Sequence, residues 1–197
     1  MRKDYEIILN LIPKNSKVLD IGCSDGELIS HLENKGVSAQ GVELNQEKVI
    51  KCLEKGLDVI HGDINLIVED FPFNQFDYCL LTQTIQAVQK PYQLLNTLKK
   101  VSKNIIVSFN NSARLSKISN FLLSGSFDSL LKKANSDHWY NTDYIHPCSI
   151  KDFKKLAVNL DLKIISTFDV INQRKFENGK IPSNLFCKEV LFHITDE

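Results

Sequence analysis

The residues best suited to hold a ligand lie in one glycine-containing stretch, VLDIGCSDGEL (Val18 to Leu28). It places an acid before a turn that holds two glycines and a serine; the candidate binding residues in it are Asp20, Gly22, Cys23, Ser24 and Gly26. A glycine turn between a buried strand and a helix lets the backbone approach a ligand closely and directs helix N-terminal N–H groups toward it. The stretch therefore predicts a small-molecule site at the end of the strand.

Acidic residues follow the next two expected strands. Glu43 stands 17 residues beyond Gly26, and a carboxylate there can accept hydrogen bonds from both hydroxyls of a ribose. Asp63 lies in the tripeptide GDI, where it could accept from an adenine amino group while Ile64 packs on the adenine face. Because parallel strands end at one edge of a sheet, these positions together predict a nucleoside site there.

The spacing of the turn separates two kinds of nucleoside ligand. A dinucleotide-binding turn has the pattern G-x-G-x-x-G, whereas here Ser24 stands between Gly22 and Gly26. Asp20 brings a carboxylate close to the turn, which would repel a pyrophosphate but attract an ammonium group. S-adenosylmethionine (SAM) carries an amino group and a sulfonium and has no phosphate. The electrostatics therefore favour SAM over a dinucleotide.

The same five residues, Gly22 to Gly26, also spell the nucleophile elbow G-x-S-x-G. A hydrolase would need a later acid and base, for which Asp143 and His146 could be proposed. Such an elbow follows an oxyanion-hole loop from an earlier strand, however, and the short segment before Ser24 has no room for one. The hydrolase interpretation is therefore disfavoured.

Apolar periodicity predicts one α/β domain over residues 1–197, with a mostly parallel sheet covered by helices on both faces. The expected strands are 17–22, 38–44, 58–63, 76–83, 104–111, 162–171 and 185–194. The expected helices are an N-terminal one within 1–16 and those at 25–36, 45–56, 91–101, 112–125 and 149–161. The last two strands predict an antiparallel hairpin at the end of the sheet. Residues 112–148 are interpreted as a lid on the acceptor side, because 126–147 has no clear period.

Composition excludes several classes of function. Lys plus Arg and Asp plus Glu both total 24, so the chain lacks the basic excess typical of nucleic-acid binding. The five cysteines are scattered without a C-x-x-C pair, which disfavours zinc or a disulfide framework and favours a reducing cytoplasm. No histidine pair has metal-ligand spacing, and no apolar run approaches the roughly 18 residues of a membrane span.

At this point the chain resembles the class I SAM-dependent methyltransferases, through VLDIGCSDG, GVELN and GDI. Three further stretches are similar to the MetW family of methionine biosynthesis proteins: LLTQTIQAV (Leu80 to Val88), IVSFNN (Ile106 to Asn111) and WYNTDYIHPCSIKDF (Trp139 to Phe153). The resemblance implies a Rossmann-like sheet of seven strands with the C-terminal strand antiparallel. It also implies SAM contacts from Asp20, Gly22, Glu43, Leu44, Asp63 and Ile64, with Thr82 and Gln83 near the methionine half and S-adenosylhomocysteine (SAH) as product.

Two positions depart from the family pattern. Ser24 stands where the family has its middle glycine, and Asn110 replaces a proline after the fifth strand. If Ser24 needs a positive φ, the conformation costs about 1 kcal/mol. We expect this to weaken SAM binding without abolishing it.

Few residues can be assigned to catalysis, because methyl transfer from a sulfonium depends chiefly on orientation and needs a base only for a protonated acceptor. Candidates near the acceptor are Gln83, Gln86, His138, Trp139, Tyr140 and His146, of which Gln83, Tyr140 and His146 are the catalytic candidates. For His146 a structural hydrogen bond is the favoured role.

Two functions are compatible with these residues. One is a methyltransferase acting on an unidentified small acceptor. The other follows from the resemblance, since the MetW family is associated with homoserine O-acyltransferase and is thought to activate it, with SAM as a sensed ligand. An enzyme should have a closed acceptor pocket beside the sulfonium, whereas a pure partner should expose an apolar patch, for which residues 118–131 are the candidate.

Overall fold

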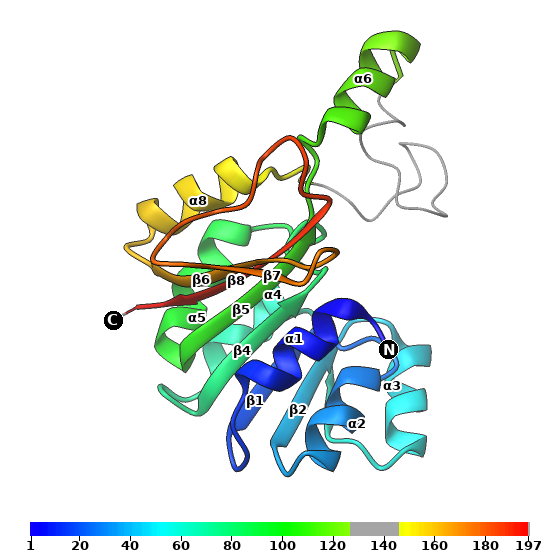
Figure 1. The fold of residues 1–197 in the computed structure, drawn as a ribbon. Coiled ribbons are helices and arrows are strands. Elements are labelled where there is room, and N and C mark those ends of the chain that lie inside the picture. The colour runs from blue at the N-terminus through cyan, green and yellow to red at the C-terminus, as the bar shows by residue number, and fades with distance from the viewer. Residues whose placement is uncertain (127–145, 197) are drawn as a thin grey trace.

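The protein, seen as a computed structural model that describes residues 1–126 and 146–196, is built on one eight-stranded sheet (Figure 1). The strand order is β3-β2-β1-β4-β5-β8-β6-β7. The strands are β1 (Lys17–Ile21), β2 (Ser38–Glu43), β3 (Val59–His61), β4 (Phe76–Thr82), β5 (Ser102–Asn110), β6 (Lys163–Asp169), β7 (Arg174–Glu177) and β8 (Glu189–Thr195).

The pairing confirms a mostly parallel sheet with an antiparallel C-terminal strand. Strands β1 to β5 pair in parallel, and β8 inserts antiparallel between β5 and β6. The expected count of seven strands is corrected to eight, because Arg174–Glu177 folds back on β6 as β7. Residues Gln173 and Asn178 flank this strand at positive φ. Only Phe176 is apolar in the short strand, so the sequence has no alternation that would predict it.

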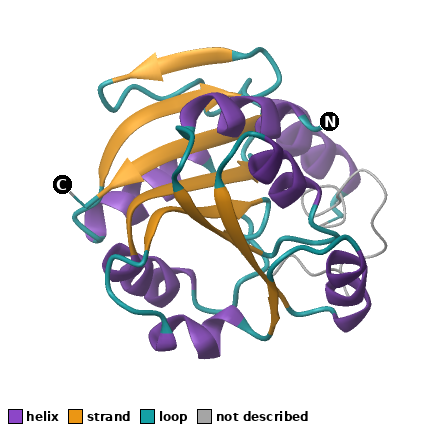
Figure 2. Ribbon diagram, turned by 90° about the horizontal axis from the view of Figure 1, so that it is seen from below, coloured by secondary structure: helices purple, strands orange, loops and turns teal. Residues whose placement is uncertain are grey.

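Helices cover both faces of the sheet, as Figure 2 shows. Helices α1 (Lys3–Leu11), α2 (Glu27–Asn34) and α3 (Gln46–Glu54) lie in the half of the fold around β1 and β2 (Figure 1). The later elements are α4 (Ile64–Ile67), the 3-10 turn η1 (Val68–Asp70), α5 (Pro91–Val101), α6 (Leu115–Ser124) and α8 (Ile150–Asn159). Among the described residues, α4 and η1 are the helical elements that the sequence did not predict.

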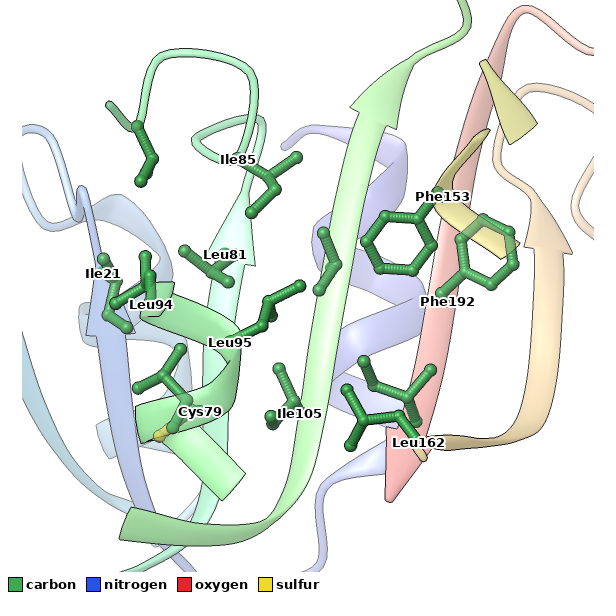
Figure 3. Close-up of a cluster of buried hydrophobic side chains, with 14 of the residues drawn as sticks. Ile21, Cys79, Leu81, Ile85, Leu94, Leu95, Ile105, Phe153, Leu162 and Phe192 are labelled. Atoms are coloured by element: carbon green, nitrogen blue, oxygen red, sulfur yellow. The ribbon is translucent and has the colours of Figure 1, made fainter. Parts of the chain in front are cut away.

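Two apolar clusters hold the layers together. One lies under α5 and α8 and includes Phe109, Phe153 and Phe192, whose rings pack with centroids 4.6 to 6.0 Å apart. Figure 3 shows Phe153 and Phe192 side by side in this cluster. The other lies under α1 and α2 and includes Ile8 and Leu28, both fully buried. Because successive residues of a strand face opposite sides, each central strand contributes to both clusters.

The ends of several helices follow from their sequences. Asn45 accepts hydrogen bonds from Glu47 N and Lys48 N at the start of α3, as an N-cap asparagine should. Ser149 and Asp152 form the expected capping box of α8. Pro91 is the first residue of α5, where its missing N–H costs nothing. These local signals make the helix starts predictable from sequence.

The structure describes only part of the segment 112–148 that was interpreted as a lid. Residues 112–126 contain α6, which stands away from the sheet in Figure 1. His138, Trp139, Tyr140 and Asp143 lie outside the described residues, so the lid and the roles suggested for these side chains stay predictions. Over residues 1–126 and 146–196, no helix has the length and apolar character needed to cross a membrane.

Candidate functional site

The glycine turn after β1 has an unusual backbone. Gly22, Ser24 and Gly26 all have positive φ, at 73°, 55° and 77°. A Cβ on Gly22 would lie 2.6 Å from Thr84 Oγ1, and one on Gly26 would lie 2.3 Å from Leu57 Cδ1. Both glycines are therefore required for close packing as well as for backbone conformation. Ser24 adopts the positive φ that was expected to be costly for a side-chain-bearing residue.

The N–H groups of the turn are used within the protein. Gly22 N and Cys23 N donate to Val42 O at 2.8 and 3.2 Å, and Ser24 N donates to Glu43 Oε2 at 2.8 Å. The turn therefore does not present these N–H groups to a ligand, as its sequence suggested. A pyrophosphate requires such free donors. The N–H groups of Gly22, Cys23 and Ser24 are therefore not available to a pyrophosphate.

Glu43 ends β2 and connects the turn to α3. Its Oε2 accepts from Ser24 N, and its Oε1 accepts from Asn45 N at 2.9 Å. The residue is 8% exposed, so these bonds hold a nearly buried carboxylate in place. Each carboxylate oxygen can accept a second hydrogen bond. Glu43 is thus both a structural acceptor and a group that can still bind two hydroxyls.

Asp63 lies two residues beyond the end of β3, in the neighbouring strand connection. Its Oδ1 caps α4 by accepting from Asn65 N at 2.9 Å and Asn65 Nδ2 at 2.7 Å. No bond to its Oδ2 occurs within the described part of the chain, so this oxygen can accept from a ligand. Ile64 follows at once and is 7% exposed. The helix cap and the ligand role are therefore compatible in one side chain.

These residues surround a single cavity of about 700 Å³ at the carboxyl edge of the sheet. That volume lies within the usual range for small-molecule sites. The cavity brings together five predicted residues: Gly22, Glu43, Leu44, Asp63 and Ile64. The remaining lining residues are Ile21, Val42, Asn45, Lys48, Gly62, Asn65, Thr84, Ala87 and Val88.

Several predicted residues do not line this cavity: Asp20, Cys23, Ser24, Gly26, Thr82 and Gln83. Cys23 is buried, and its Sγ lies 2.6 Å from where a Cβ on Gly41 would stand. Burial raises the pKa of this thiol, so Cys23 has the space-filling character expected of it.

Sequence reasoning missed the wall that follows β4, formed by Thr84, Ala87 and Val88. None of these three side chains carries a charge, and the Thr84 hydroxyl donates to Thr82 O at 3.2 Å. The signal that could have indicated them is their position directly after a parallel strand, at the same sheet edge.

A buried group of charges lies beside the turn. Asp20 is 1% exposed, and its Oδ1 has no hydrogen-bond partner within the described residues. The pKa of Asp20 is raised to about 7, chiefly by burial; the guanidinium of Arg2 opposes this rise, and the nearby Asp4 and Glu43 add to it. Asp20 is therefore a poorly solvated carboxyl with two further acids, Asp4 and Glu43, in its surroundings.

Gln83 and His146 make structural contacts. Gln83 has φ 59°; its Nε2 donates to Glu189 Oε1 and its Oε1 accepts from Asn110 Nδ2, both at 2.8 Å. His146 N donates to Gln86 O at 3.0 Å, and its Nε2 lies 3.1 Å from Gln89 O. The hydrogen-bonded role favoured for His146 agrees with this geometry.

Comparison with known proteins decides the family. The sequence matches the family described as methionine biosynthesis protein MetW over residues 2–194. The chain belongs to the MetW family. A relative from Rhodopirellula baltica, the bifunctional methionine biosynthesis protein MetXA/MetW, is 30% identical over 96% of this chain. The match spans 32% of that relative, so this MetW-family chain corresponds to about a third of it.

Solved structures show the same fold at low identity. A SAM-dependent methyltransferase from Methanosarcina mazei has a TM-score of 0.71 at 13% identity, covering 96% of both chains. A SAM-dependent methyltransferase from Thermotoga maritima, described as a possible histamine N-methyltransferase, has a TM-score of 0.68 at 16% identity, covering 99% of this chain and 88% of that one. The MetW-family chain thus has a methyltransferase fold.

Proposed function

We propose that the cavity binds SAM and that the protein transfers its methyl group to a small acceptor, with SAH as the product. The observation that carries this proposal is the placement of Glu43 and Asp63, from neighbouring strands, in one cavity with Gly22. Glu43 would hold the ribose hydroxyls, and Asp63 Oδ2 would accept from the adenine amino group. Ile64 and Leu44 would pack on the adenine ring.

The proposed chemistry asks little of the protein beyond positioning. Bound SAM would supply an electrophilic methyl group to the lone pair of the acceptor, and the electrons of the broken C–S bond would stay with sulfur. The turn at Gly22 and the wall at Thr84 would fix the cofactor, so that the acceptor could approach in line with the breaking bond. A base is needed only when the acceptor arrives protonated. A cavity lined mainly by residues that position the ligand by packing is sufficient for this chemistry.

The Asp63→Asn substitution tests the adenine assignment. Asparagine is as good an N-cap as aspartate, so α4 should persist, but its Nδ2 would face the adenine amino group donor to donor. We expect SAH affinity, measured by calorimetry, to fall about tenfold. S-inosyl-homocysteine has a carbonyl in place of the amino group, and its binding should improve relative to SAH in this variant.

Asp58→Asn is the matched control. Asp58 accepts from Gln40 Nε2 at 2.8 Å at an exposed position and does not line the cavity. Its substitution should leave both affinities unchanged. Equal effects of the two substitutions, or an unchanged ligand preference in Asp63→Asn, would contradict the adenine assignment.

A second candidate function, activation of a partner enzyme, is favoured by helix α6. None of its residues is buried, and Leu122 and Leu123 are 75% and 87% exposed. Leu115 N bonds Leu185 O at 2.7 Å, which brings the exposed Phe186 segment next to the helix. The R. baltica relative joins MetXA and MetW in one chain. The partner would be a homoserine O-acyltransferase, docked on the leucines of α6.

Co-elution with a purified homoserine O-acyltransferase tests this second function. The double substitution Leu122→Asp/Leu123→Asp should abolish a complex that forms with the wild type. Leu53→Asp on α3, where the side chain is 56% exposed, is the control and should leave it intact. Complex formation that survives the double substitution would exclude α6 as the docking surface.

A further inference from the structure

A second cavity lies between α4 and η1 on one side and α5 on the other. Its volume is about 330 Å³, which is at the small end of the range for small-molecule sites. Helix α5 packs against η1, so ordered elements form both walls. Asp63 and Asn65 line both cavities, whereas the other residues of the second cavity do not line the first. The proposed methyl transfer makes no use of this second cavity.

Three apolar side chains line the second cavity. Val68 and Leu94 are 3% and 2% exposed, whereas Leu66 is 76% exposed and leaves apolar surface in water. A ligand group that covered these side chains would gain free energy if it were apolar. The cavity therefore favours a ligand with an apolar part.

Charges of both signs line the same cavity. Lys90 precedes the first turn of α5, whose partial positive charge also favours an anion there. Glu69 of η1 is an acid on the opposite wall. The ion pairs in the described part of the chain involve neither Lys90 nor Glu69. Exposed charges are ordinarily satisfied by water, but opposite charges held apart on two walls can bind both ends of a dipolar ligand.

The acidic wall also contains an unsatisfied oxygen. Asn65 Nδ2 donates to Asp63 Oδ1 at 2.7 Å, while Asn65 Oδ1 is buried without a partner among the described residues. A buried, unpaired oxygen requires a donor to satisfy it. An ammonium group carries three donors. The wall that contains Glu69 and Asn65 is thus suited to an ammonium group, and the Lys90 end is suited to a carboxylate.

We infer that this second cavity binds a small zwitterion with an apolar side chain, which is the chemistry of a free apolar α-amino acid. Lys90 binds the carboxylate of the ligand, and Glu69 and Asn65 face its ammonium group. The side chain of the ligand covers Leu66, Val68 and Leu94. This site is additional to the proposed SAM site, since Lys90 and Glu69 do not line the first cavity.

Calorimetric titration with L-norleucine tests this site, with the protein saturated by SAH so that the first cavity is filled. Norleucine carries both charges and a four-carbon apolar side chain. Hexanoate lacks the ammonium group, and pentylamine lacks the carboxylate. The wild type should bind norleucine saturably with one site per chain, and each analogue at least about tenfold more weakly.

Two variants assign the ends of the ligand. Lys90→Gln should weaken norleucine binding at least about tenfold and leave the affinity for pentylamine within about twofold. Glu69→Gln should weaken norleucine binding similarly and leave the affinity for hexanoate within about twofold. Lys100→Gln on α5 and Asp70→Asn on η1 are the matched controls, because both residues are exposed and neither lines the cavity. The controls should change no affinity, and all four variants should melt as the wild type does.

Two results would overturn the inference: no saturable binding of norleucine, or binding that neither Lys90→Gln nor Glu69→Gln weakens. Displacement of SAH by norleucine would place the amino acid in the first cavity and would overturn it as well. If the wild type does not bind SAH, the proposed function fails. The same titration of the free protein and its two variants then still decides whether the second cavity binds the zwitterion.

Discussion

At the scale of single residues, the site contains groups that lower the stability of the folded protein. Asp20 is a buried carboxyl with an unpartnered oxygen, and Ser24 holds a backbone conformation that favours glycine. Features of this kind persist in proteins when the surrounding structure or a ligand compensates for them. Each has a measurable effect on stability that does not depend on knowing the ligand.

Asp20→Asn should stabilise the protein in a pH-dependent manner. The pKa of Asp20 is raised from 3.8 to about 7, so the folded state keeps the proton that the unfolded state loses. The stabilisation from the neutral carboxyl is complete below about pH 4 and is lost as the pH rises to about 7. In urea unfolding, the variant should match the wild type near pH 4 and exceed it by up to about 4 kcal/mol at pH 8.

Asp25→Asn, in the same turn, is the control, because Asp25 is exposed. Its substitution should change the free energy of unfolding by the same amount at every pH between 4 and 8. If the stability difference between Asp20→Asn and the wild type did not change with pH, the Asp20 carboxyl would be ionised and stabilised in the folded protein.

Ser24→Gly should relieve strain in the turn. The left-handed conformation at φ 55° costs serine about 1 kcal/mol, and the added freedom of glycine in the unfolded chain offsets part of this gain. The free energy of unfolding should rise by about 0.5 kcal/mol. Ser30→Gly, inside α2, should instead lower the free energy of unfolding, because glycine is unfavourable in the interior of a helix. Destabilisation by Ser24→Gly would mean that the serine side chain makes a needed contact.

At the scale of elements, one side chain ties the carboxyl ends of β4 and β5 to the start of the antiparallel strand β8. Gln83 at the end of β4 bonds Asn110 of β5 and Glu189 of β8. Asn110 is the position where the resemblance predicts proline, and a proline could not donate this bond. The departure from the family pattern therefore has a structural explanation: Asn110 holds Gln83 in its positive-φ conformation.

Gln83→Ala should lose both hydrogen bonds and destabilise the protein by about 1–2 kcal/mol in urea unfolding. Asn110→Ala removes one of them and should cost less. The double variant should be less destabilised than the sum of the two singles, because the same bond is counted in both. Gln93→Ala on the exposed surface of α5 is the control, expected within about 0.5 kcal/mol of wild type. Strict additivity would show that the bond contributes nothing.

Elements with strong local signals were predictable, and those defined by long-range contacts were not. The strand before the glycine turn, the Asn45 cap and the Ser149 capping box follow from nearby residues. Strand β7 forms because β6 offers a partner, and its own residues carry no strand pattern. Residues 118–131 were named as the apolar patch that a partner protein would expose, whereas the separation of α6 from the sheet is a tertiary feature.

At the scale of the whole molecule, the order of the strands determines which residues meet. Glu43 and Asp63 were predictable because parallel strands β2 and β3 end at the same edge. Arg2 and Asp4 were not, because the bond that Ser108 Oγ donates to Asp4 Oδ2 joins residues 104 apart in sequence. Sequence spacing identifies groups on consecutive strands, and it does not show which helix covers them. The sequence therefore indicated Glu43 and Asp63 in the cavity wall and Asp20 in the turn, whereas Arg2 and Asp4 were found near Asp20 only in the fold.

The most direct test of the central claim is calorimetric titration of the wild-type protein with SAM, with NAD as the comparison ligand. The cavity is lined by Glu43 and Asp63 and lies beside the unpaired carboxyl of Asp20, so it should bind the cationic nucleoside and reject the pyrophosphate. We predict saturable binding of SAM with one site per chain and no heat from NAD. Binding of NAD, or no binding of SAM, would contradict the assignment of this cavity as a SAM site.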